Sequence, residues 1–88
     1  MSMQARMHRK LNEAFTPEML EVIDESHQHH GHAGWREGGE THFRVVMTSA
    51  AFDGQNRVNR QRAVNKCLAD ELSTTVHALA MELKAPGE

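Results

Sequence analysis

Residues 42–48 read His-Phe-Arg-Val-Val-Met-Thr, and their apolar and polar side chains alternate. Successive side chains of a strand point to opposite faces of a sheet, so the alternation places Phe43, Val45 and Met47 together on one face. The stretch therefore predicts a strand with one face against a core, and it is the clearest periodic signal in the chain. The Asp53-Gly54 pair that follows indicates a turn.

Two elements are expected before this strand. Apolar residues spaced by three and four predict a helix over residues 3–15, which ends before Pro17 because the residue preceding a proline avoids the α region. The apolar stripe of this helix consists of Met3, Met7, Leu11, Ala14 and Phe15. Residues 19–25 are short and partly β-branched, and they predict a strand that pairs antiparallel with residues 42–48.

The 16 residues between these strands, 26–41, include four glycines, four histidines and Trp35. Loops longer than about 12–15 residues without secondary structure are usually functional or disordered. This segment is therefore a candidate binding region.

A second helix and a third strand are expected after residue 55. Residues 56–72 predict a helix, and its apolar side carries Val58, Val64, Cys67, Leu68 and Leu72. Residues 76–83 predict a strand with two apolar faces, of which the small one, with Ala78 and Ala80, would let a helix approach closely. The order αββαβ predicts a single α+β domain over residues 1–88, with both helices packed on one face of a three-stranded sheet.

The size and composition of the chain exclude several classes of protein. With 88 residues it can hold one modest core, which excludes a two-domain enzyme with a cofactor crevice. A single cysteine excludes a disulfide framework and suits a reducing compartment, for which we expect the cytoplasm. The sequence has no run near the ~20 apolar residues of a membrane span, no catalytic triad and no phosphate loop, so we expect neither a membrane protein nor an enzyme.

Histidines are the first candidates for metal chemistry, because neutral imidazole binds Zn, Cu, Fe and Ni. His27, His29, His30 and His32 lie close together in the long loop but match no zinc template. They could form a solvated polar loop, or a simple zinc or copper buffer that needs no partner. His77 falls on an apolar strand face, where it could be either a satisfied core histidine or a ligand.

A basic run is the second candidate site. Arg57, Arg60, Arg62 and Lys66 place four positive charges in ten residues without an acid among them, although the net charge of the chain is −2. Cations at the start of a helix oppose its dipole, which indicates an external anion such as phosphate or carboxylate. The alternative is a solvated basic face.

Two other features favour structural interpretations. Cys67 lies on the apolar side of the second helix and is better read as a small buried hydrophobe than as a reactive thiol. Residues 31–34 form a GxxG pattern like the backbone clamp of KH domains, but that clamp belongs between helices and this pattern lies between two strands.

Several segments, read together in their order and spacing, resemble the BolA family over residues 3–86. They are Asp24-Glu25-Ser26, then His29 and Gly31-His32, then Gly39-Glu40-Thr41-His42-Phe43, Arg60-Gln61-Arg62, Glu71-Leu72 and Val76-His77-Ala78-Leu79. The last segment is the sharpest. One departure is Gln61, which stands where the family commonly has a histidine between two arginines.

The resemblance implies a class II KH-like fold and a binding function. BolA-like proteins partner monothiol glutaredoxins and share a glutathione-ligated [2Fe–2S] cluster, to which His77 would supply one imidazole and His29, with His32 as competitor, a second. No cluster is expected in the isolated chain, which would be a monomer or weak homodimer. Members of this type also bind DNA as transcriptional regulators, an activity that would fall on Arg60, Arg62 and Lys66.

Imidazole ligation makes the shared cluster sensitive to pH. A histidine binds metal only when neutral, and the reference pKa of imidazole is about 6.5. We therefore expect cluster sharing to weaken below about pH 6. A visible-absorbance titration that shows no loss down to pH 5 would contradict imidazole ligation.

Overall fold

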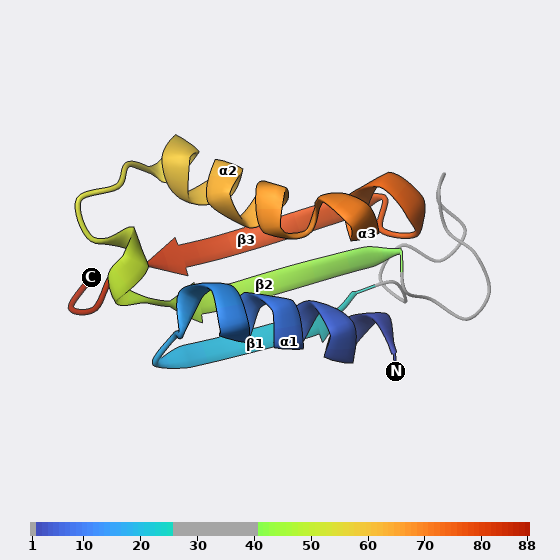
Figure 1. The fold of residues 1–88 in the computed structure, drawn as a ribbon, viewed down its shortest axis with the longest axis horizontal. Helices are drawn as coiled ribbons and strands as arrows, with labels where there is room; N and C mark the ends of the chain where they lie inside the picture. The colour runs from blue at the N-terminus through green and yellow to red at the C-terminus, as the bar shows by residue number, and fades with distance from the viewer. Residues whose placement is uncertain (1, 26–40) are drawn as a thin grey trace.

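A mixed sheet with β2 (His42–Thr48) at its centre organises the fold (Figure 1). The computed structural model describes residues 2–25 and 41–88. β1 (Met19–Asp24) pairs antiparallel with β2, and β3 (Ala78–Lys84) pairs parallel with it. The first two predicted strands and their antiparallel pairing are thus confirmed.

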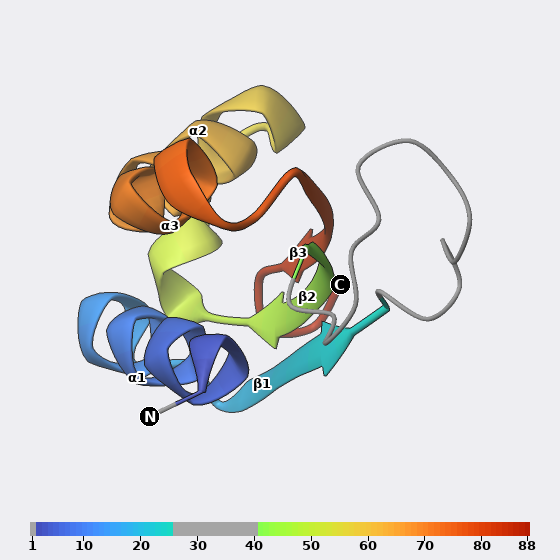
Figure 2. The same ribbon diagram turned by 90° about the vertical axis from the view of Figure 1, so that its right-hand side faces the viewer.

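The helices of the described residues all cover the same face of the sheet (Figure 2). They are α1 (Met3–Phe15), α2 (Arg57–Cys67) and α3 (Ala69–Thr74), and a short 3₁₀ helix, η2 (Ala50–Phe52), follows β2. The core between the two layers includes Met7 and Leu11 from α1, Phe43, Val45 and Met47 from β2, and Val64 and Leu68 from the second helical region. The predicted α+β class, element order and one-sided packing are confirmed.

The predicted second helix is in fact two helices. The backbone at Leu68 departs from helical values (φ −104°, ψ 21°), so α2 ends there and α3 begins one residue later. Leu68 is fully buried, and the break lets both helices pack against the core. The predicted start of this helix at residue 56 is confirmed within one residue. Asn56 is the N-cap of α2, and its side-chain oxygen accepts from the Asn59 N–H at 2.8 Å.

The orientation of β3 is also different from the prediction. Its larger side chains, Leu79, Met81 and Leu83, pack against the core, whereas Ala78 and Ala80 lie on the opposite face. Large side chains fill the space below α2 better than alanines, because a well-packed interior leaves few voids. Two residues assigned to apolar helix sides, Ala14 and Val58, are exposed.

A buried carboxylate joins α1 to α3. The side chain of Glu71 is fully buried, and its oxygens lie 2.6 Å from Arg6 Nε and 2.8 Å from Lys10 Nζ. Burial alone would raise the pKa of Glu71, but the hydrogen bond from Lys10 and the charges of Lys10 and Arg6 lower it overall below its ordinary value of 4.5. The two helices are therefore held together by an ionised acid inside the protein.

Glu71→Gln is expected to lower the free energy of unfolding by about 1–3 kcal/mol, because the amide cannot replace the charge-assisted hydrogen bonds. The pKa of Glu71 is lower in the folded chain, so its stabilising contribution is complete above its ordinary pKa of 4.5 and disappears as the pH falls through the folded value. Urea unfolding at pH 7 and pH 3 should show a smaller pH dependence in the variant. Glu13→Gln, at an exposed position of α1, is the control and should behave like the parent chain.

Candidate functional site

His77 is the residue that immediately precedes β3. Its side chain is exposed, which rules out the interpretation as a buried core histidine. Its backbone is fixed, since the His77 N–H donates to the Thr41 carbonyl at 2.7 Å and the Val76 N–H donates to the Glu71 carbonyl at 3.0 Å. The structure thus holds an accessible imidazole on a well-bonded backbone.

A second histidine lies beside this position. Ala78, the neighbour of His77, is the register partner of His42, which is nearly buried and whose Nδ1 lies 2.8 Å from the Thr41 hydroxyl. Sequence reasoning placed His42 on the polar face of its strand but gave it no role. Its burial suits support of this end of the sheet rather than direct contact with a ligand.

The two predicted loop ligands, His29 and His32, lie outside the described residues. Within residues 2–25 and 41–88, no group of three His, Cys, Asp or Glu side chains could hold a metal ion. A metal bound at His77 would therefore need ligands from residues 26–40 or from another molecule.

A hollow of about 370 Å³ opens on the face of the sheet opposite the helices, beside His42 and Ala78. Arg44 lines it and pairs with Glu25 at 3.0 Å and, more loosely, with Glu82 at 3.7 Å. The hydrogen bond and the charge of Glu25 raise the pKa of Arg44. Its positive charge is therefore already compensated within the chain.

The structure divides the predicted basic run into two parts. Arg57 and Arg60 line a groove between α2 and β3, whereas Arg62 and Lys66 are exposed and one helical turn apart. Arg60 is already paired, since its Nη1 lies 2.6 Å from Glu88 Oε1. An external anion would thus meet Arg62 and Lys66 on one surface and Arg57 on another.

The junction between α2 and α3 is the place in this fold where two helices meet end to end, as a KH-type clamp requires. Its sequence, Cys67-Leu68-Ala69, contains no glycine, and Asp70 follows it. The GxxG pattern at residues 31–34 lies outside the described residues. The α2–α3 junction therefore lacks the glycines with which that clamp approaches a nucleic-acid backbone.

Cys67 is partly buried against α1, with its Sγ 3.7 Å from the Lys10 carbonyl oxygen. Burial raises the pKa of the Cys67 thiol. The thiolate is the nucleophilic form, so we expect this cysteine to react slowly in the folded chain. The structure favours the interpretation of Cys67 as a packing residue.

Alkylation of Cys67 by iodoacetamide at neutral pH should be several-fold slower in the folded chain than in concentrated guanidinium chloride. Mass spectrometry of quenched time points measures both rates. Equal rates would show that the thiol is freely accessible and ionises normally.

No helix in the described part of the chain is long and apolar enough to cross a lipid bilayer.

Comparison with known proteins identifies the family. A family model described as BolA-like protein matches residues 11–88. A Sinorhizobium protein is 54% identical over 100% of this chain and 96% of its own length, and the DNA-binding transcriptional regulator BolA of Escherichia coli (strain K12) is 48% identical over 92% of this chain and 73% of its own. The solved BolA domain of SufE1 from Arabidopsis thaliana matches with a TM-score of 0.87 at 40% identity, covering 98% of this chain and 94% of that one. These descriptions name a regulator and a domain, not an enzyme, and the chain belongs to the BolA family.

Proposed function

We propose that this protein binds a monothiol glutaredoxin and supplies His77 to a [2Fe–2S] cluster that the two proteins share with glutathione. The observation that carries the proposal is the exposed imidazole at the start of β3, on a backbone fixed to Thr41. A terminal ligand has to be accessible to its partner, and the exposure of His77 on a hydrogen-bonded backbone supports this role. The cytoplasm is the compartment that we propose for this activity.

The donor chemistry of His77 fits such a cluster. Imidazole replaces thiolate on one iron in known [2Fe–2S] centres and raises the reduction potential. The thiols would come from the glutaredoxin and from glutathione, and the second imidazole from His29 or His32. The chain's own contribution is to present His77, with Glu71 and Thr41 fixing the turn that precedes β3. The isolated chain is expected to be colourless.

Addition of this protein, without oxygen, to a cluster-loaded monothiol glutaredoxin with glutathione should produce a new visible circular dichroism spectrum that saturates at one equivalent. His77→Ala should lose it, because the cluster would lose an iron ligand. His8→Ala, which removes an exposed histidine from α1, is the matched control and should behave like the parent chain. Separate His29→Ala and His32→Ala variants would identify the second ligand.

Far-UV circular dichroism would verify that each variant is folded. A new spectrum that His77→Ala preserves would show that His77 is not a ligand. An unchanged spectrum with the parent chain would exclude cluster sharing with that glutaredoxin.

DNA binding is the second candidate function, favoured by the name of the Escherichia coli relative and by the exposed cations of α2. Arg62 and Lys66 are available for phosphate contacts, and Arg57 has no partner among the described residues. Arg60 is paired with Glu88, which reduces the contacts expected from the whole run. The net charge of −2 places this function second.

With about three phosphate contacts, the logarithm of DNA affinity should fall with the logarithm of salt concentration with a slope of about −2 to −3. Arg62→Gln/Lys66→Gln should make this slope less steep by about 2 units, as fluorescence anisotropy with a labelled duplex would measure. The control is Arg9→Gln, which removes an exposed cation from α1. An unchanged slope in the double variant would show that DNA does not bind along this side of α2.

A further inference from the structure

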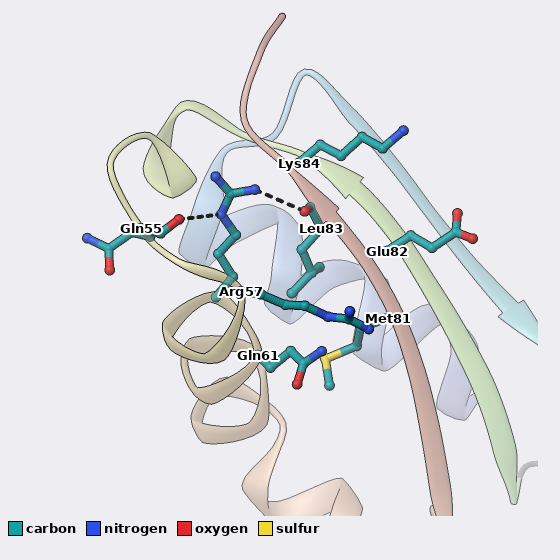
Figure 3. Close-up of a pocket in the computed structure, with 8 residues that line it drawn as sticks. Gln55, Arg57, Gln61, Met81, Glu82, Leu83 and Lys84 are labelled. Atoms are coloured by element: carbon teal, nitrogen blue, oxygen red, sulfur yellow. Dashed lines mark hydrogen bonds between the residues drawn. The ribbon is translucent and has the colours of Figure 1, made fainter. Parts of the chain in front are cut away.

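A groove of about 560 Å³ lies between the first turns of α2 and the second half of β3. Gln55, Arg57, Arg60 and Gln61 line it on the helix side. On the strand side it is lined by residues 81–84. Figure 3 shows Arg57 and Gln61 extending from α2 toward β3, while the side chains of Glu82 and Lys84 extend away from α2. The charged side chains that α2 contributes to this groove are therefore those of Arg57 and Arg60.

The wall opposite α2 is the outer edge of the sheet. β3 is an end strand, because the strand order is β1-β2-β3. The Lys84 carbonyl faces β2 and accepts from the Ser49 N–H at 2.9 Å, whereas the Leu83 carbonyl faces the groove and accepts from Arg60 Nη1 at 3.2 Å. Backbone groups alternate sides along a strand, so the N–H and C=O of Met81 also point outward. Such an edge can pair with one more extended chain.

Arg60 forms a carboxylate receptor at the end of this edge. Its Nη1 and Nη2 donate to the two carboxylate oxygens of Glu88 at 2.6 and 2.7 Å. The guanidinium is fixed from behind, since Nε donates to the Gln55 carbonyl at 2.9 Å and the Phe52 ring centroid lies 5.9 Å from its central carbon. This planar, bidentate geometry matches a carboxylate or a phosphate, and in this structure a carboxylate occupies it.

Glu88 reaches Arg60 through a tight turn. Gly87 has a positive φ of 88°, and the Glu88 N–H donates back to the Ala85 carbonyl at 3.2 Å. The hydrogen bonds from Arg60 and from the Ala85 N–H, the latter at 2.9 Å, hold the pKa of Glu88 at about 2, so this carboxylate is ionised at neutral pH. The Glu88 side chain is nevertheless 46% exposed, whereas that of Arg60 is 12% exposed. The acid is the accessible and replaceable member of the pair.

We propose that this groove binds an extended acidic peptide segment of a protein partner. The segment adds as a strand to the outer edge of β3, and one of its carboxylates takes the place of Glu88 on Arg60. A second acid of the segment meets Arg57. The outward N–H and C=O groups of β3 match a peptide backbone, and Glu88 shows which chemical group the Arg60 fork accepts.

Fluorescence anisotropy with a labelled hexapeptide of alternating Val and Glu tests this site. The same peptide with Gln in place of Glu, and a labelled single-stranded oligonucleotide, are the comparison probes. Glu88→Gln should bind the acidic peptide about tenfold more tightly than the parent chain, because the competing intramolecular carboxylate is gone. Adding Arg60→Gln to Glu88→Gln should abolish this gain.

Two further variants keep the result interpretable. Arg57→Gln removes a cation from the groove at an exposed position and should weaken peptide binding, whereas Arg62→Gln removes the same charge outside it and should not. Amide signals of Met81 and Leu83 in ¹H–¹⁵N spectra should shift on peptide addition. Equal binding of the Gln peptide, tighter binding of the oligonucleotide in the same groove, or no binding of the acidic peptide to Glu88→Gln would each overturn the proposal.

Discussion

The ionised carboxylate of Glu71, buried between Arg6 and Lys10, is the interaction on which the arrangement of the helices depends. It connects α1 and α3, and its partners Lys10 and Glu71 are 61 positions apart in the sequence. A buried charge that is not paired costs free energy. If α1 and α3 separated, the Glu71 carboxylate would either become exposed or remain buried without its two cations. The backbone of Glu71 has a second task, since its carbonyl accepts the N–H of Val76. The same residue thus fixes the helix pair and the turn that leads to His77.

β3 carries both surfaces to which a function is assigned in our proposals. His77 lies just before its first residue, and the arginine groove lies along its second half. The two surfaces carry different chemistry, a single imidazole at one end and two arginines at the other. Because they lie at opposite ends of one strand, a partner could occupy one of them while leaving the other accessible.

The regular periods of the sequence were sufficient to predict most of the fold. The alternation at residues 42–48 and the apolar stripe of α1 identified the central strand and its covering helix correctly. The break at Leu68 could not be predicted, because no glycine or proline marks it and tertiary packing decides it. Both faces of β3 are apolar, so the sequence alone does not indicate which face meets the helices.

The candidate site was predicted less completely. The resemblance predicts His77 as a ligand, and this stays a prediction. Its exposure became apparent only from the structure, in which β3 begins at Ala78, two residues later than the sequence predicts. The pairing of Arg60 with Glu88 joins residues 28 positions apart and has no local signal. The burial of Glu71 could not be predicted from the sequence either, because an acidic residue in a helix is most often exposed to solvent.

The parallel pairing of β3 with β2 has a consequence for how the molecule assembles. Parallel neighbours require a crossover, and here residues 49–77 form it. The chain has to close this long loop before β3 can dock, so β3 is the strand whose contacts are most distant in sequence. An opening confined to β3 and its crossover would dismantle both surfaces while β1 and β2 stay paired. Both surfaces therefore depend on the pairing of β3 with β2, the strand pairing that joins the residues most distant in sequence within the described sheet.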